Sequence, residues 1–167
     1  MPIEPAAFRD ALRHAPAGVS VVTIRSGATL HGLTVSAFAS VSPEPPLVAV
    51  MIDHRHFAHE LLRAPGAVFA VNVLAEDQRA LSERFAWSPN EERFELGRWT
   101  TAATGAPVLA DALAWLDCRL FSSHAAGSHT LYVGLVEASA VPRPGEPPLV
   151  YWNRDYRRLD PTRPVEP

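Results

Sequence analysis

The sequence contains no lysine, and all 15 of its basic residues are arginine. Without lysine, the protein cannot form a Schiff base with a carbonyl substrate or hold pyridoxal phosphate as an imine. A nucleotide-binding P-loop is excluded for the same reason, because that loop needs a lysine before its serine or threonine. The nine glycines never fall in a Gly-x-Gly-x-x-Gly pattern, so a Rossmann-type dinucleotide site has no support. A nucleotide cofactor, if one binds, requires another architecture.

Cysteine and long apolar runs are also scarce. The single cysteine, Cys118, cannot form an internal disulfide, which agrees with a reducing compartment. Period-two alternation over residues 112–120 places Cys118 on an apolar face, where a thiol is inert. No apolar run approaches the roughly 20 residues that span a bilayer, and the first residues lack the basic start and apolar core of an export signal. We therefore expect a cytoplasmic protein that does not associate with membranes.

Charge and chain length further restrict the expected partners and the number of domains. The 15 basic and 18 acidic residues give a net charge of -3, with no basic run that would follow a phosphate backbone. Nucleic acid is not an expected partner. A chain of 167 residues, 47% of them hydrophobic, has the size of one domain with its own core. We predict a single domain over residues 1–159 and a loose tail over residues 160–167, which hold three prolines.

The hydrophobic pattern predicts mostly strands. Helical spacing is expected over residues 5–14, 56–63 and 76–85. Strands are expected over residues 18–25, 30–38, 47–52, 67–74, 111–124, 130–140 and 149–152. Residues 88–104 are expected to form an irregular segment or lid with one helical turn. Asp117 and Arg119 are expected to form an ion pair on one face of a strand. This order favours a mainly β fold with peripheral helices, a barrel or strongly curled sheet, over a doubly wound α/β fold.

The most informative segment is residues 32–42, which continues into Pro45-Pro46-Leu47. We interpret it as a strand that ends in a loop of small, hydroxylated residues. Small side chains leave backbone N–H groups uncovered, which suits a flat, polar, anionic cofactor that needs several donors at close range. Taken alone, the segment is better explained as an ordinary strand end with a serine-rich turn. That interpretation is preferred until the other motifs are considered.

The order of motifs along nearly the whole chain resembles the flavin reductase family, the small split-barrel partners of two-component flavin monooxygenases. Each motif is weak alone, but their shared order is specific. The resemblance rests on Pro16-x-Gly18-Val19, residues 32–42, Pro45-Pro46-Leu47, residues 69–74, Arg84-Phe85-Ala86, Arg93-Phe94, Gly127-x-His129-Thr130 and Pro148-Leu149-Val150-Tyr151.

This resemblance implies a homodimeric, FMN-binding split β-barrel. It implies that FMN or FAD receives a hydride directly from NADH or NADPH, so that no catalytic acid or base is needed. The reduced flavin would then serve a partner monooxygenase. The alternative within the same fold is a flavoprotein that retains its FMN as an electron carrier or acts on another substrate.

The resemblance also implies roles for particular residues. Backbone amides would stabilise the charge that develops at the flavin ring edge. The amides are assigned to Thr34, Val35, Ser36 and Ala37, with Ser40 and Ser42 in support. The flavin phosphate is assigned to Arg55, His56, Phe57 and Ala58, the frame of the pocket to Phe85 and Arg93, and nicotinamide binding to His129.

The chain departs from the family pattern at two places. Similar proteins usually carry serine and threonine where His56, Phe57 and Ala58 stand. Arg55 and a protonated His56 would replace those hydroxyls by charge-assisted bonds, so that phosphate affinity falls as pH rises through the imidazole range. Ser128 stands where the family usually has an aspartate beside the histidine, which leaves the nicotinamide preference open.

The pattern His54-x-His56-x-x-His59 offers a competing interpretation, because this density of histidines is typical of zinc or iron sites. Only His56 and His59 share a helical face, and a loop of solvated histidines is the simpler explanation. A metal-binding barrel is therefore the third candidate, after the diffusible-flavin reductase and the flavin-retaining protein.

Overall fold

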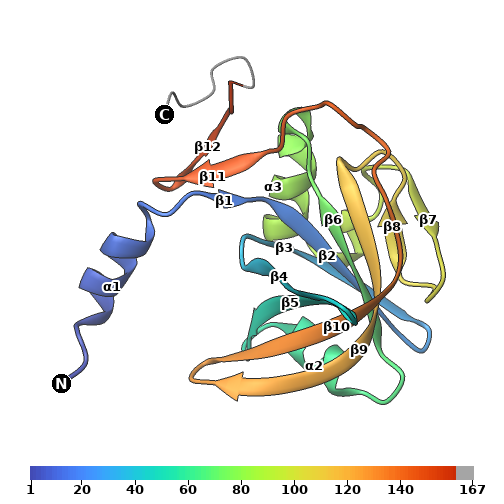
Figure 1. Ribbon diagram of the computed structural model, residues 1–167, viewed down its shortest axis with the longest axis horizontal. Coiled ribbons are helices and arrows are strands. Elements are labelled where there is room, and N and C mark those ends of the chain that lie inside the picture. The colour runs from blue at the N-terminus through green and yellow to red at the C-terminus, as the bar shows by residue number, and fades with distance from the viewer. Residues whose placement is uncertain (161–167) are drawn as a thin grey trace.

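The computed structural model describes residues 1–160 and shows a molecule built mainly of β-strands (Figure 1). The helices are α1 (Pro5–Leu12), α2 (Phe57–Arg63), the 3-10 helix η1 (Glu76–Gln78), α3 (Arg79–Trp87) and α4 (Asn90–Arg93). The longer strands are β2 (Ser20–Ser26), β3 (Thr29–Val35), β4 (Phe38–Pro43), β5 (Pro46–Asp53), β6 (Val68–Val73), β9 (Ala114–Ala126) and β10 (His129–Ala140). Short strands are β1 (Ala17–Gly18), β7 (Trp99–Thr101), β8 (Pro107–Leu109), β11 (Val150–Trp152) and β12 (Asp155–Arg157).

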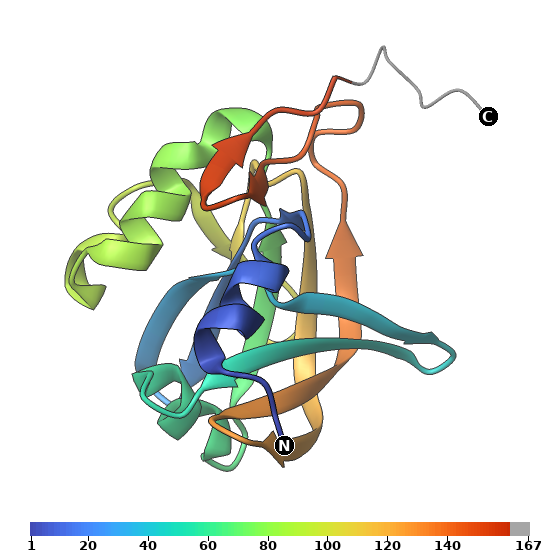
Figure 2. The ribbon, with the colours of Figure 1, turned by 90° about the vertical axis from the view of Figure 1, so that its left-hand side faces the viewer.

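The seven longer strands form one sheet in the order β3-β2-β6-β9-β10-β5-β4. Every neighbouring pair in this sheet is antiparallel. The two edge strands, β3 and β4, follow one another in the chain and are separated only by Ser36 and Ala37. The sheet must therefore curl until its edges come together at this link, which gives the expected split barrel. Beyond the link, the β4–β5 hairpin extends away from the body of the molecule (Figure 2).

The curled sheet encloses an apolar core that α2 closes at one end. Phe69 and Tyr132 are fully buried in this core, and α2 contributes Ala58 and Leu62, which are also fully buried. The ring of Phe69 lies directly over Gly134, where a Cβ atom would come within 2.4 Å of the Phe69 ring. Glycine at this position therefore lets the phenyl ring fill the core, a burial that stabilises the fold by roughly 2 kcal/mol.

A second apolar cluster packs α3 against the inner strands of the sheet. Its centre is Phe85, which is 1% exposed and contacts the rings of Phe94 and Trp99 at centroid distances of 5.2 Å. A Cβ atom at Gly32 would lie 2.4 Å from the Phe85 ring, so β3 and α3 approach closely only because residue 32 is glycine. This packing fixes the position of edge strand β3 against α3.

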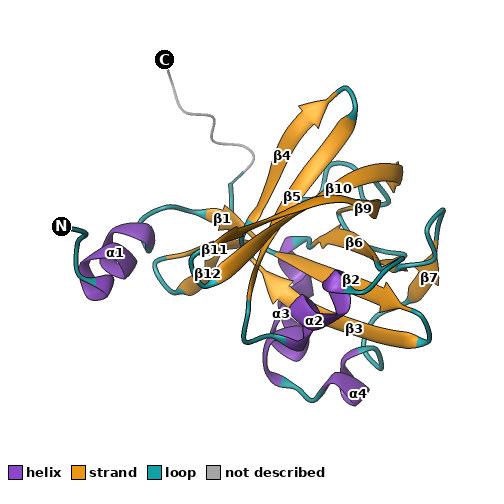
Figure 3. Ribbon diagram, turned by 90° about the horizontal axis from the view of Figure 1, so that it is seen from below, coloured by secondary structure: helices purple, strands orange, loops and turns teal. Residues whose placement is uncertain are grey.

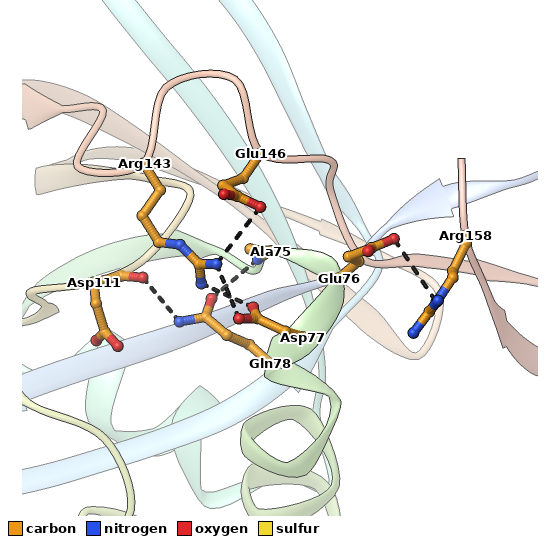
Figure 4. A network of polar contacts seen from close by, with 8 residues as sticks. All are labelled: Ala75, Glu76, Asp77, Gln78, Asp111, Arg143, Glu146 and Arg158. Carbon is orange, nitrogen blue, oxygen red and sulfur yellow. Dashed lines mark hydrogen bonds and ion pairs between the residues drawn. The ribbon is translucent and has the colours of Figure 1, made fainter. Parts of the chain in front are cut away.

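A polar network joins η1 to the segments that follow β8 and β10 (Figure 4). The guanidinium of Arg143 donates two hydrogen bonds to Asp77, at 2.8 and 2.9 Å. Gln78 accepts a hydrogen bond from the Ala75 N–H at 3.0 Å and donates one to the Asp111 carbonyl at 2.8 Å. These bonds hold the connection after β10 against η1, and the hairpin of β11 and β12 then lies beside α3 (Figure 1).

Helix α1 stands away from the body of the molecule (Figures 1 and 3). None of its residues is buried, and its apolar side chains Phe8 and Leu12 are 52% and 53% exposed. Two hydrogen bonds hold the carboxyl end of the helix against the C-terminal hairpin. The Trp152 indole donates a hydrogen bond to the His14 carbonyl at 3.0 Å, and the Asn153 N–H donates one to the Arg13 carbonyl at 2.9 Å.

Cys118 lies in the main core, as its place in the alternating pattern predicts. Burial, reinforced by the nearby Asp117 charge, raises the pKa of the Cys118 thiol to about 12, so the thiol is protonated and unreactive. Within residues 1–160, no helix has the length and apolar character needed to cross a membrane.

The fold class is confirmed, but several element predictions are wrong. The expected strand over residues 30–38 ends at Val35, and the segment expected to be a loop forms strand β4, which pairs with β5. Residues 88–104 contain not only the expected helical turn, α4, but also strand β7. The predicted tail falls, apart from Asp160, outside the residues that the structure describes.

The predicted ion pair between Asp117 and Arg119 is also wrong. Asp117 is fully buried and accepts hydrogen bonds from the backbone and the hydroxyl of Thr104. Arg119 instead pairs with Glu137 on the neighbouring strand β10, at 2.6 Å. A bulge in the β9–β10 ladder near these residues shifts the register, so simple alternation does not predict their partners.

Candidate functional site

The segment from Thr34 to Ala37 contains the last two residues of β3 and the two residues that link β3 to β4. Among residues 1–160, strand β3 pairs with β2 alone, and on its outer edge the carbonyls of Leu30 and Gly32 accept hydrogen bonds from the side chains of Asn90 and Arg93. The hydroxyl of Thr34 donates a hydrogen bond to the Ser82 carbonyl in α3 at 2.6 Å, which fixes the end of β3. The Ala37 carbonyl accepts a hydrogen bond from Met51 N–H at 3.1 Å. Ser36, between these two anchors, is exposed.

A pocket of about 180 Å³ opens beside this link. Its lining combines the end of β3 with α3 and with the C-terminal hairpin. The lining residues are Val19, Thr34, Val35, Ser36, Ser82, Ala86, Trp87, Tyr151 and Tyr156. The pocket thus places the end of a strand whose outer edge pairs with no other described strand next to three large aromatic side chains, an arrangement that suits a flat, polar ring.

Tyr156 is held in this wall by three contacts. Its hydroxyl lies 2.7 Å from the Ser82 hydroxyl, its ring meets Tyr151 edge-on at 5.4 Å, and the Arg79 guanidinium lies 4.9 Å from its centroid. Sequence reasoning did not assign Tyr156 or Ser82 to the site. The signal is weak, because the two residues are 74 positions apart and their segments meet only in the folded protein.

A second hollow, of about 270 Å³, continues from the first, since Ser36 and Tyr151 line both. It runs toward α1 and is lined there by Arg9, Arg13 and Arg154. The continuous groove therefore starts at aromatic side chains and ends among arginines.

The segment predicted to bind the phosphate follows β5. Arg55 is bonded to Asp53, with Nη2 to Oδ2 at 2.7 Å, and these hydrogen bonds hold the pKa of Asp53 well below its usual range. His56 precedes the first residue of α2, and Phe57 is half-exposed with its ring edge against His31. Ala58 is fully buried, so only its backbone is available to a ligand.

His129 lies near this segment, because it is directly opposite Asp53 in the β5–β10 ladder. Its Nδ1 is 2.9 Å from the hydroxyl of Ser128, which therefore orients the imidazole where the family usually has an acid. The structure thus gathers Arg55, His56 and His129 at one end of β5. These contacts do not test their assignment to flavin and nicotinamide, which stays a prediction.

The other predicted residues lie on supporting elements. Phe85 is buried behind Gly32, and Arg93 donates hydrogen bonds to the Ser88 carbonyl at 2.8 Å and to the Gly32 carbonyl at 2.5 Å. Both side chains therefore contact β3 at Gly32 and hold the strand in position. Ser40 and Ser42 lie in β4, where the Ser42 hydroxyl accepts a hydrogen bond from Glu44 N–H at 3.2 Å.

The histidine cluster does not converge as metal ligands do. The rings of His54 and His59 are tilted against one another, with centroids 4.5 Å apart and planes inclined by 35°. Among residues 1–160, no three histidine, cysteine, aspartate or glutamate side chains gather closely enough to hold a metal ion.

The family model described as a flavin reductase like domain matches residues 12–160. The chain belongs to this family. It is 43% identical over 154 residues to the reductase component of 4-hydroxyphenylacetate 3-monooxygenase from Thermus thermophilus, covering 92% of this chain and 95% of that protein. It is 37% identical over 153 residues to an FMN reductase (NADH) from Agrobacterium fabrum, covering 91% and 87%.

Solved structures of the family share the fold. An NADH:FAD oxidoreductase from Streptomyces globisporus superimposes with a TM-score of 0.87 at 30% identity, covering 96% of this chain and 98% of that chain. The split barrel expected from the motifs is therefore confirmed.

Proposed function

We propose that the protein is an NAD(P)H:flavin oxidoreductase that passes a hydride to FMN or FAD and supplies the reduced flavin to a partner monooxygenase. Membership of the flavin reductase family supports the reaction class, and a relative named as a monooxygenase reductase component supports the partner. The observation that carries the proposal is the end of β3, where Thr34 and Val35 line a pocket walled by Trp87, Tyr151 and Tyr156.

The residues present fit a flavin. A flavin accepts hydride at its ring and needs hydrogen-bond donors where negative charge develops, not a protein nucleophile. The link from Thr34 to Ala37 supplies backbone and hydroxyl groups with little side-chain bulk, and the aromatic wall supplies a surface for a planar ring. In this proposal, these residues orient the flavin ring so that nicotinamide can stack on it.

The outer parts of the site would hold charge and position the nicotinamide. Arg55, together with His56 when protonated, would attract the flavin phosphate, and the backbone at Phe57 and Ala58 would complete that contact. His129, oriented by Ser128, would bond the carboxamide or pyrophosphate of the nicotinamide cofactor. Ser40 and Ser42 would contact the ribityl side, while Phe85 and Arg93 support the ring site through β3.

We also propose a homodimer. The resemblance to the flavin reductase family implies that a second copy of the chain lies near the flavin site. The uncovered side chains Phe8 and Leu12 on α1 offer an apolar surface for that chain. The one buried cysteine suits a reducing compartment, and we propose the cytoplasm.

Ser36→Phe tests the ring site, because a bulky side chain in the exposed link would fill the pocket mouth. Flavin binding should weaken by more than about tenfold, with NADH oxidation falling in parallel and stability unchanged. Ser139→Phe, at an exposed position on β10 outside the pocket, is the matched control. Fluorescence titration with FMN measures the affinity. Equal FMN affinity in the two variants would remove the link from the site.

The flavin-retaining alternative makes a different prediction for the purified protein. A reductase of the diffusible type is obtained partly free of flavin, whereas an electron carrier is obtained saturated with it. An absorption spectrum from about 300 to 500 nm separates the two, because the polypeptide itself gives no visible bands and the flavin bands then report the flavin that copurifies.

A further inference from the structure

A third hollow, of about 360 Å³, lies at the end of the barrel that α2 closes. Figures 1 and 2 show α2 and the tip of the β9–β10 hairpin together at this end, with α3 at the other, and residues of α3 line the aromatic pocket. The hollow is lined by His54, His59, Arg63, Ser123, Thr130 and Tyr132, together with Ala125. Phe57, by contrast, packs on His31 of β3, and Arg55 pairs with Asp53. None of the residues assigned to flavin and nicotinamide lines the hollow, although His54 and Thr130 are chain neighbours of Arg55 and His129.

The polar side chains of this hollow are held in place by one another. The Tyr132 hydroxyl lies 2.7 Å from His59 Nδ1, and His54 Nε2 lies 3.0 Å from the Thr130 hydroxyl. Tyr132 and Thr130 are almost fully buried and form a fixed back wall. Each imidazole uses one ring nitrogen in these bonds and keeps the other for a ligand. The site is thus preorganised.

The charges of the hollow are all of one sign. No carboxylate lines it, and Arg63 has no ion-pair partner within residues 1–160. Burial, followed by the charges of His54 and Arg63, lowers the pKa of His59, and the neighbouring Glu60 opposes this only in part. An anion in the hollow would relieve this repulsion and favour the protonated form of His59.

We propose that this hollow binds a phosphoryl group. The Arg63 guanidinium offers paired donors that match the oxygens of a phosphate, and the two imidazoles and the hydroxyl of Ser123 supply further donors from other directions. The volume leaves room for the molecule to which the phosphate is attached. A metal ion is not the proposed ligand, because among residues 1–160 no three histidine, cysteine, aspartate or glutamate side chains gather closely enough to hold one.

Isothermal titration of the purified protein with inorganic phosphate tests the proposal without any reaction. The wild-type protein should bind phosphate saturably, and Arg63→Gln and His59→Gln should each weaken that binding by about tenfold. Arg63 is exposed, so its replacement should not disturb folding. The control is Arg98→Gln, an exposed arginine that lines none of the three hollows described above. Absence of saturable binding, or equal binding by Arg63→Gln and Arg98→Gln, would overturn the proposal.

Paired ligands then identify the source of the phosphoryl group. If it belongs to the flavin, Arg63→Gln weakens binding of FMN but not of riboflavin. If it is the 2′-phosphate of the nicotinamide cofactor, the variant lowers kcat/KM for NADPH but not for NADH. If neither pair separates while phosphate binding is lost, the ligand is free phosphate. Because the phosphate titration needs no turnover, its failure is distinguishable from failure of the proposed reductase activity.

Discussion

His31 is the residue whose surroundings are most clearly set by folding. It is 6% exposed, its ring meets Phe57 edge-on at 5.6 Å, and its Nδ1 atom has no hydrogen-bond partner among the described residues. Burial, together with the charge of Arg93, lowers the pKa of His31 from 6.5 to about 4. The folded protein therefore holds His31 neutral under mildly acidic conditions in which the unfolded chain would protonate it.

This difference predicts how stability depends on pH. Because the pKa of His31 is lower in the folded than in the unfolded state, its contribution is complete above about pH 6.5 and is lost as the pH falls toward 4. The free energy of unfolding should fall by about 2 kcal/mol between about pH 7.5 and about pH 5 from this residue. His31→Gln should remove that part of the decrease. Urea unfolding at the two pH values measures it, and an unchanged pH dependence in the variant would contradict the assignment.

Three residues that the sequence assigns to the flavin, Thr34, Val35 and Ser36, line the pocket, but the side chains that complete the hollows were not predicted. The small residues from Thr34 to Ala37 were identifiable, since their composition itself exposes the backbone. The partnership of Ser82 with Tyr156, and that of Tyr132 with His59, was not, because each joins positions more than 70 residues apart. Such contacts depend on how the sheet curls, which local patterns do not encode.

At the scale of elements, strand β4 shows why local composition misleads. Ser40 and Ser42 have low strand propensity and follow small residues, so a loop was the natural expectation. The segment is nevertheless extended, because it pairs with β5 from Phe38 to Pro43. Long apolar strands such as β5 and β6 were predicted well, since burial on both faces leaves a strong signal.

The packing of β3 against α3 predicts the effect of a single methyl group. Gly32→Ala would place Cβ 2.4 Å from the buried ring of Phe85, so either the ring or the helix must shift. The free energy of unfolding should fall by about 1–3 kcal/mol. Gly18→Ala is the control, because no atom lies within 4 Å of a Cβ there. Chemical denaturation compares the two, and similar stabilities would show that β3 and α3 are less closely packed than described.

At the scale of the whole molecule, the two ends of the barrel differ in character. One end carries the aromatic pocket and the groove leading to α1. The other carries the hollow beside α2 that is proposed to bind a phosphoryl group. Helix α1 contributes no buried residue to its own chain, which is unusual for an amphipathic helix and is explained if it packs on a second copy.

The proposed dimer predicts that charge on α1 separates the subunits. The double variant Phe8→Glu, Leu12→Glu should sediment as a monomer, whereas the wild-type protein sediments as a dimer, because carboxylates cannot be buried unpaired in an apolar interface. Val141→Glu, at a 61% exposed position after β10, is the control and should stay dimeric. Analytical ultracentrifugation gives the result. An unchanged dimer in the double variant would place the interface elsewhere.

The central claim is that the protein transfers hydride from a nicotinamide to a flavin held at the end of β3. The most direct test is the rate of NADH or NADPH oxidation by the purified protein as flavin is added. The account predicts little oxidation without added flavin and a rate that rises with FMN or FAD until it saturates. Nicotinamide oxidation that is absent at every flavin concentration, with both nicotinamides, would contradict it.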